Sequence, residues 1–413
     1  MRRLLTASAS ILLVATAPAA AAPGDLDRAF GTNGRLFVEG ILGGLGEDGT
    51  GLSSLSTLSD GRIVLLGTER SSLSCDPFLV LSRRTPAGAP DPTLTAGRSP
   101  GVLVVGSRDD ADPKSTSLFG AAVRPDGGLV TGRTLTGTSS LVAYGPDGVA
   151  AAPVPSARPV APEVVLPDGR VLGRAGRSLR SVVRLTAALT ADPAFGAGRA
   201  LGVPAGLREP LPLTVSGRGV ISGSYTARGL ALWRTGADAA ARPTVSTVRV
   251  PLTGPGAVSS LTARQVVAAR SGRAILVGTA IRARGFMPVA LLARFDRTGR
   301  TEAGFGRDGV VSVSGREPAV AVDRSGRVVV ATLAGRRPEP GAEIRVIVRR
   351  LGPRGVPDPS FRAKVISLGN GFATGLCLSI DPRGRILVGV GFSPTFTQGG
   401  VTLLRLQGGT SGR

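Results

Sequence analysis

One ten-residue stretch, LSDGRIVLLG from Leu58, returns in altered form along the whole chain and limits the fold more than any other feature. Copies begin at Arg124 (RPDGGLVTG), Leu166 (LPDGRVLG), Ser216 (SGRGVISGS), Arg270 (RSGRAILVG), Arg324 (RSGRVVVAT) and Pro382 (PRGRILVGV). Their glycines recur every ~40 to 65 residues, a period typical of repeat arrays and propellers. We therefore expect seven similar units.

Each copy has the pattern of a β-hairpin. Asp-Gly or Ser-Gly stands between an alternating stretch, such as AVAVD before Arg324, and a β-rich run, such as RVVVAT after it. Glycine accepts the positive φ that tight turns require. A third strand follows, as in ALLARF from Ala290, and a fourth follows sequences such as EAGFGRDGVVSV from Glu302. Seven units of four short strands predict an all-β, seven-bladed β-propeller, in which neighbouring sheets bury each other's apolar faces.

The order of the strands predicts how the ring closes. The chain starts with a strand of the fourth type near Arg35 to Val38 and ends with one of the third type near Val401 to Leu406. We expect the N-terminal strand to complete the last blade, because this pairing removes an exposed sheet edge. The propeller domain then covers residues 23–407, and residues 408–413 form a flexible tail.

The first 22 residues have the pattern of a signal peptide. Arg2 and Arg3 precede an apolar stretch from Ile11 to Val14 and a small-residue tract, APAAAAP. No other run reaches the roughly 18 apolar residues that a membrane-spanning helix needs. The sequence thus predicts a secreted protein without a membrane anchor.

Composition limits the chemistry and the partners. Histidine is absent, which excludes the usual Ser-His and Cys-His nucleophile systems and His-ligated metal sites. The net charge is +22 and is carried almost entirely by arginines that are spread along the chain. Nucleic-acid footprints are patches or stripes instead. We expect a solvated basic surface and no nucleic-acid partner; an extracellular polyanion binder is the alternative.

The two cysteines, Cys75 and Cys377, suggest a disulfide bond, because an exported chain with an even number of cysteines favours one. Ring closure makes the first and last units neighbours. Cys75 lies between the second and third strands of the first unit, and Cys377 lies in the first strand of the last. We expect a bond between them across this seam.

The repeats resemble a known family. GDLDRAFGTNGRL from Gly24, LSDGRIVLLG from Leu58 and ALLARFDRTGRTEAGFGRDGVV from Ala290 are similar to the delta-60 repeat, a bacterial β-propeller-type repeat of exported proteins. The resemblance covers nearly the whole mature chain, although units two and four lack the Asp-x-x-Phe-Gly element. It implies the propeller fold and export, and it carries no catalytic residue.

Two residue types recur once per unit. Arginine recurs in the third strand, and Tyr144 stands near that position in unit two; the arginines are Arg83, Arg184, Arg234, Arg294, Arg350 and Arg405. Phenylalanine follows an acidic residue at Phe30, Phe195, Phe305 and Phe361, with Leu94 in the same position. A ring of cations could bind a polyanion, and the rings could form a ligand cage. A residue repeated in every blade usually serves the blade, so we favour structural roles for both sets.

Departures from the repeat are the better candidates for function. The stretch SRDDADPKSTS holds Asp109, Asp110 and Asp112 in the expected loop between the first two blades, and clustered carboxylates suit calcium. In unit six, Arg336 and Arg337 stand between the second and third strands. Phe392 and Phe396 hold the equivalent place in unit seven, so these four residues could frame a ligand-binding patch.

The sequence favours a non-catalytic binding or scaffold module that meets its ligand on the loop face around the central channel. We assign no catalytic residue and no cofactor, with calcium as the open option. The partner is an unknown extracellular ligand or protein, and a closed ring needs no second copy, so we expect a monomer. The alternative is a propeller enzyme of the calcium-dependent hydrolase or lactonase type that uses loop carboxylates.

Overall fold

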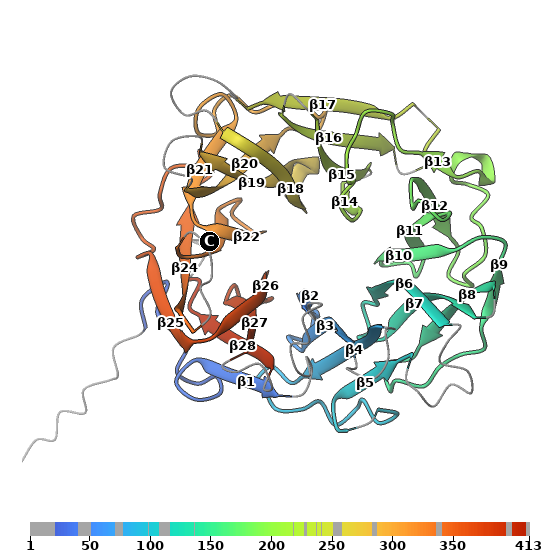
Figure 1. Cartoon of the computed structure of the whole chain (residues 1–413), viewed down its shortest axis with the longest axis horizontal. Helices are drawn as coiled ribbons and strands as arrows, with labels where there is room; N and C mark the ends of the chain where they lie inside the picture. The colour runs from blue at the N-terminus through green and yellow to red at the C-terminus, as the bar shows by residue number, and fades with distance from the viewer. Residues whose placement is uncertain are drawn as a thin grey trace, which may run out of the picture.

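The protein is a ring of seven antiparallel four-stranded sheets, as the computed structural model shows (Figure 1). The structure describes residues 21–39, 51–70, 77–97, 99–106, 116–135, 137–217, 219–226, 229–236, 238–240, 242–250, 258–282, 287–335, 341–393 and 399–409. The seven four-stranded sheets confirm the predicted seven-bladed β-propeller.

In each blade, the strands are arranged from the centre of the ring outwards in the order in which they occur in the chain. In the order of blades 1 to 7, the first strands are β2 (Leu52–Thr57), β6 (Thr116–Val123), β10 (Val160–Val165), β14 (Thr214–Ser216), β18 (Val258–Ala268), β22 (Arg316–Val322) and β26 (Phe372–Ile380). The second strands are β3 (Ile63–Arg70), β7 (Leu129–Leu135), β11 (Val171–Ala175), β15 (Gly219–Thr226), β19 (Ala274–Arg282), β23 (Val328–Leu333) and β27 (Ile386–Ser393). The third strands are β4 (Pro77–Arg84), β8 (Thr138–Tyr144), β12 (Ser181–Leu185), β16 (Gly229–Gly236), β20 (Pro288–Phe295), β24 (Glu343–Leu351) and β28 (Gly400–Leu406).

The fourth strands form the outer wall of the ring (Figure 1). They are β5 (Val102–Val105), β9 (Val154–Ser156), β13 (Leu201–Gly202), β17 (Thr244–Arg249), β21 (Val310–Ser314), β25 (Lys364–Asn370) and, for the last blade, β1 (Arg35–Glu39). β1 pairs antiparallel with β28, from Arg35 opposite Leu404 to Glu39 opposite Gly400. The predicted closure by the N-terminal strand is therefore confirmed.

Apolar side chains pack between adjacent blades and form the core. The middle strands are buried on both faces: every residue of β20 and β27 is buried. One core cluster joins Ile221 and Leu232 of blade 4 to Leu276 and Leu291 of blade 5. This packing explains the near-continuous apolar runs in these strands, because a sheet covered on both faces has no solvent-facing alternation.

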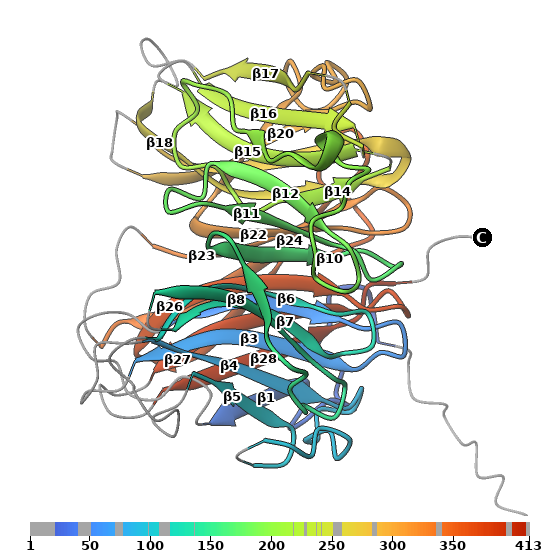
Figure 2. The same cartoon turned by 90° about the vertical axis from the view of Figure 1, so that its right-hand side faces the viewer.

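Two faces of the ring must be distinguished. The hairpin turns between first and second strands lie on the same face as the connections between third and fourth strands, because the strands alternate in direction; we call this the turn face. The opposite face, here the loop face, carries the connections from second to third strands and from blade to blade. Figure 2 shows the strands crossing the ring between these two faces.

Helical structure is minor in the described part of the chain. It consists of two 3₁₀ turns, η1 (Gly196–Gly198) and η2 (Arg270–Gly272). None of the described helices is long and apolar enough to cross a membrane.

Candidate functional site

Five of the six recurrent third-strand arginines are buried and paired with an acid, which follows in the connection to the fourth strand or, for Arg405, lies in the N-terminal segment. Arg234 of blade 4 is half-buried, and Arg242 stands where the others have the acid. The side chain of Arg83 is fully buried, and its Nε lies 2.6 Å from Asp91 Oδ2. The same contact joins Arg184 to Asp192 (2.7 Å), Arg294 to Glu302 (2.9 Å), Arg350 to Asp358 (2.7 Å) and Arg405 to Asp27 (2.8 Å). We call these five residues (Asp27, Asp91, Asp192, Glu302 and Asp358) the shared acids.

A second guanidinium nitrogen of these arginines reaches the next blade. Nη1 of Arg83 donates to the carbonyl oxygen of Gly127 at 3.0 Å, and Nη1 of Arg294 donates to that of Pro353 at 2.5 Å. Equivalent bonds join Arg234 to Gly272, Arg350 to Gly408 and Arg405 to Pro86. These bridging arginines therefore hold neighbouring blades together, as we favoured from the sequence.

The recurrent phenylalanines complete the same contact. Their rings lie beneath the guanidinium groups at 5.1 Å for Arg184 and Phe195, 5.5 Å for Arg294 and Phe305, 4.8 Å for Arg350 and Phe361, and 4.3 Å for Arg405 and Phe30. A cation over a ring face at this distance is attracted by the ring quadrupole. These rings are buried parts of the blade contacts rather than a ligand cage.

Sequence reasoning missed a second set of arginines that bind the shared acids. We call them the turn arginines: Arg62, Arg170, Arg273, Arg327 and Arg385 each follow a hairpin glycine. Arg62 lies 3.2 Å from Asp91, and Arg385 lies 3.6 Å from Asp27. The Gly-Arg pair, which occurs in six of the seven copies of the repeat, was the signal that could have revealed them; the sixth arginine, Arg218, lies outside the described residues.

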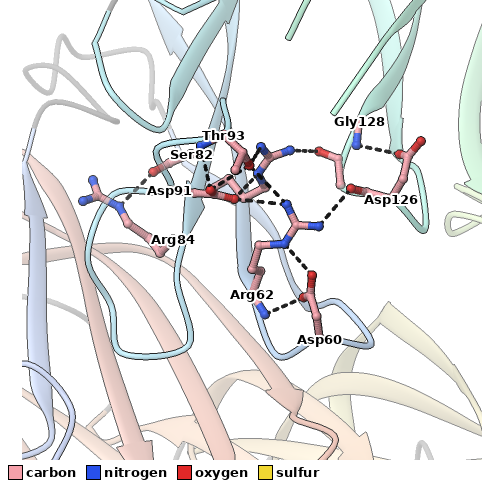
Figure 3. Close-up of polar contacts among 10 residues, drawn as sticks. Asp60, Arg62, Ser82, Arg84, Asp91, Thr93, Asp126 and Gly128 are labelled. Carbon is pink, nitrogen blue, oxygen red and sulfur yellow. Dashed lines mark hydrogen bonds and ion pairs between the residues drawn. The ribbon is translucent and has the colours of Figure 1, made fainter. Parts of the chain in front are cut away.

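Asp91 shows how the surrounding hydrogen bonds change the pKa of a shared acid (Figure 3). Burial alone would raise the pKa of its carboxyl group, but hydrogen bonds from Thr93, Arg62 and Arg83 outweigh burial and lower the pKa to about 2. Each shared acid with two arginines leaves one net positive charge, so part of the basic composition is structural.

Blade 2 lacks this arrangement. The strand register places Ala143 opposite Val130, the position equivalent to Arg83 opposite Val64, so Tyr144 is one residue away from the arginine position. The N–H of Ala151 donates to the carbonyl of Ala143 as that of Asp91 does to Arg83. Both partners of the ion pair are thus alanine in this blade.

A hollow of about 670 Å³ lies along the channel beside blade 2 and is lined mainly by the first strands of blades 1, 2 and 3. Gly120, Ala121 and Ala122 of β6 and Ala161 of β10 have small side chains, which set the wall back. We call it the channel pocket. Ser53, Ser54 and Ser56 line it as well, and the buried Ser56 hydroxyl has no hydrogen-bond partner among the described residues.

The charged residues Glu163 and Arg174 at the edge of the channel pocket are already engaged. Arg174 Nε donates to Glu163 Oε1 at 2.7 Å, and the backbone N–H of Leu213 donates to Glu163 Oε2 at 2.7 Å. Burial raises the pKa of Glu163, although Arg174 and Leu213 act in the opposite direction. Because Leu213 precedes the first strand of blade 4, this carboxylate joins blades 3 and 4.

Most of the predicted site residues lie outside the described residues: Asp109, Asp110, Asp112, Arg336, Arg337, Phe396 and Cys75. Phe392 is described, and its predicted loop position needs correction. It lies in β27 opposite Ala373 and Gly400, and only 8 % of its surface is exposed. Its ring packs in the core between blades 6 and 7 and does not frame a surface patch.

Cys377 lies at the seam between blades 7 and 1, as predicted. Its Sγ is 3.8 Å from the carbonyl oxygen of Leu52 in β2. Burial raises the pKa of this thiol to about 12. The bond to Cys75 stays a prediction. Within the described residues, no group of three or more His, Cys, Asp or Glu side chains is arranged to hold a metal ion.

Comparison with known proteins adds solved structures of similar fold. No protein-family model and no curated protein matches the chain. The chain is similar to the streptogramin B lyase structure, with a TM-score of 0.48 and 12% identity over 90% of this chain and 98% of that one. It is also similar to the β-propeller domain of the Trilobed protease from Pyrococcus furiosus (TM-score 0.47, 9% identity, 88% and 96% covered) and to the K499G mutant of the NanB sialidase from Streptococcus pneumoniae (0.45, 13%, 90% and 70%). These similarities transfer no residue role to this chain.

Proposed function

We propose that this protein is an exported binding module that holds a small, largely apolar ligand in the channel pocket. The observation that supports this proposal most directly is the pocket itself. Its volume of about 670 Å³ falls within the range of small-molecule sites, and serine hydroxyls stand among aliphatic side chains on its wall. An apolar wall supplies affinity, and a few hydroxyls orient the ligand through hydrogen bonds.

The sequence around the pocket supports this proposal. Blade 2 departs from the repeat at the bridging arginine and the shared acid, and the same blade contributes Gly120, Ala121 and Ala122 to the hollow. Side chains at the equivalent positions of blade 5 are larger, because the strand register matches Gly120 with Gln265, Ala121 with Val266 and Ala122 with Val267. A blade that departs from the common pattern next to a hollow is the expected place for function on a repeat scaffold.

The charges in the pocket favour binding over catalysis. Glu163 is bound by Arg174 and Leu213, which leaves it poorly placed to move a proton to or from a ligand. The enzyme alternative depends on Asp109, Asp110 and Asp112, which lie outside the described residues, as does any calcium site they form. No observation in the described part of the chain favours it as a second function.

A ligand screen by thermal unfolding tests the proposal. We expect at least one uncharged small molecule to raise the unfolding temperature of the mature protein, since a ligand that binds only the folded state adds RT ln(1 + [L]/Kd) of stability. Ser53→Trp, at an exposed position that lines the pocket, should abolish the shift. Thr244→Trp, on the exposed outer strand β17, is the matched control. A compound that stabilises both variants equally, or a screen without any hit, would contradict the proposal.

A further inference from the structure

A second pocket opens on the turn face, at the mouth of the channel between blades 6, 7 and 1. Its volume is about 470 Å³. Three hairpin turns line it: that of blade 1 with Thr57 and Ser59, that of blade 6 with Asp323 and Arg324, and that of blade 7 with Asp381 and Arg383. We call it the mouth pocket.

The two carboxylates of the mouth pocket are fully engaged within their own turns. Asp323 Oδ2 lies 2.6 Å from Arg327 Nε, and its Oδ1 accepts the backbone N–H groups of Ser325 and Arg327. Asp381 makes the same contacts with the backbone of Arg383 and with Arg385, whose Nε is 2.6 Å away. Each carboxylate is therefore already paired with an arginine, which makes it a poor ligand for another cation.

Arg324 and Arg383 are the unused charges of this pocket. Both are exposed, and among the described residues neither guanidinium has a hydrogen-bond or ion-pair partner. Nearby arginines behave differently: Arg327 and Arg385 bind the acids of their own turns. The mouth pocket therefore presents two free guanidinium groups around a concave surface.

The rim of the turn face is electrically asymmetric around the ring. In blades 1 to 3 the residue before the hairpin glycine is an aspartate, and Asp60 and Asp168 are each 2.6 Å from an arginine of their own turn. In blades 5 to 7 that residue is serine or arginine, and the hairpins carry the exposed arginines Arg270, Arg324 and Arg383 besides the paired acids Asp323 and Asp381. Positive charge is thus concentrated on one side of the channel mouth, over the mouth pocket and the blade beside it.

We propose that the mouth pocket binds the oxyanion group of a small molecule, a carboxylate or a phosphate, between Arg324 and Arg383. The planar guanidinium presents a fork of N–H donors that matches both groups, and charge-assisted hydrogen bonds of this kind are stronger than neutral ones. The mouth pocket shares only Leu58 with the channel pocket, and this proposal does not depend on the proposed function.

Calorimetric titration with citrate and with pyrophosphate, at a fixed ionic strength of 0.15 M, tests the proposal. We expect saturable binding of at least one probe, and the tighter of the two distinguishes a carboxylate from a phosphate site. Arg324→Gln with Arg383→Gln should weaken binding at least tenfold. Arg300→Gln with Arg354→Gln removes the same charge from exposed turn-face positions away from the pocket, and should change binding less than twofold.

The proposal would be overturned if neither probe bound the wild-type protein, or if the Arg324→Gln/Arg383→Gln variant bound the probes as tightly as the wild type. It would also be overturned if both double variants lost affinity equally, because the probes would then be attracted by net charge alone. Exposed substitutions of this kind rarely change stability, and matching unfolding temperatures verify that the variants fold. Ser53→Trp should bind the probes as the wild type does, so the outcome is independent of the channel pocket.

Discussion

A buried arginine is tolerated in this fold because each one meets several partners at once. Removing a charged group from water costs several kcal/mol unless charges and hydrogen bonds replace the solvent. Arg83 has the carboxylate of Asp91, the carbonyl of Gly127 and the hydroxyl of Thr93, at 2.6, 3.0 and 2.8 Å. At the scale of the residue, the arginine bridges two blades only because an acid and a turn carbonyl lie within its reach.

The pKa of Asp91 predicts an acid-sensitive stability. A carboxyl group with a pKa of about 2 in the folded state and 3.8 in the unfolded state stabilises the fold above pH 4, and that contribution is lost as the pH falls towards 2. It amounts to about 2 kcal/mol. Asp91→Asn should lower the free energy of unfolding by at least this amount at pH 7, and the difference from wild type should shrink between pH 4 and pH 2.

Urea unfolding at pH 7, 4 and 2.5 measures this difference. Asp147→Asn is the control, because Asp147 is exposed and, within the described part of the chain, its carboxylate accepts one hydrogen bond, from the N–H of Val149. A difference between wild type and Asp91→Asn that stays constant with pH would show that the loss is one of packing and not of charge.

At the scale of the element, the seam between blades 2 and 3 shows how one blade replaces the common contact. In other turns, a glycine with positive φ lies against the large side chain of the preceding blade: a Cβ on Gly88 would lie 3.0 Å from Phe30, and one on Gly355 would lie 3.1 Å from Phe305. Blade 2 has Val154 where blades 3, 5, 6 and 7 have phenylalanine. Blade 3 has Leu189, with φ of 63°, where blades 1, 2, 5 and 6 have glycine.

Leu189 therefore fills the space that a phenylalanine of blade 2 would occupy. It is 6 % exposed and packs in a cluster with Val130 and Leu141 of blade 2 and with Val171 of blade 3. The apolar contact takes the place of the bridging arginine, at the cost of a left-handed backbone conformation at a non-glycine residue.

Replacing Leu189 with glycine should destabilise the protein in spite of the relaxed backbone. The buried leucine side chain contributes about 2 to 4 kcal/mol, whereas the strain at positive φ amounts to about 1 kcal/mol. Ala239→Gly is the matched control, since Ala239 holds the same turn position in blade 4 with φ of 54° and loses only a methyl group. We expect a lower unfolding temperature for Leu189→Gly and little change or a small increase for Ala239→Gly. Equal effects would contradict the filling role of Leu189.

The sequence was sufficient to predict the blades and the closure of the ring, because both follow from a local pattern repeated at a fixed period. It could not show the alternative contact at blade 2. Val154 and Leu189 are about thirty-five residues apart, and their meeting depends on strand register, which a shift of one residue changes. The same limit misplaced Phe392: the sequence placed it in a loop, but β27 continues to Ser393 and pairs Phe392 with Ala373. The mouth pocket, too, requires three turns from different blades to meet.

At the scale of the whole molecule, the ring is held shut by a strand from the opposite end of the chain. The N-terminal segment adds Phe30 and, from β1, Val38 to the core between blades 7 and 1, where Val38 is 1 % exposed. Asp27 adds the shared acid for Arg405, so the N-terminal segment supplies both the apolar and the ionic part of the last blade. Closure should therefore be coupled to the stability of the entire ring, since neither end of the array has another neighbour.

Val38→Asp tests whether the ring behaves as one unit. An unpaired carboxylate in this core should cost at least about 3 kcal/mol and lower the unfolding temperature in a single transition. Val245→Asp, on the outer strand β17 of blade 4, places the same charge at a position that is 43 % exposed and should change little. Limited trypsin digestion distinguishes unfolding of the whole ring from detachment of β1 alone. If β1 were not needed for the stability of the ring, the Val38→Asp variant would be cut at Arg28 or Arg35 while its unfolding temperature stayed that of the wild type. Simultaneous loss of protection along the chain is the result we expect, because opening the seam frees the unpaired edge of blade 7 and uncovers the apolar face of blade 1.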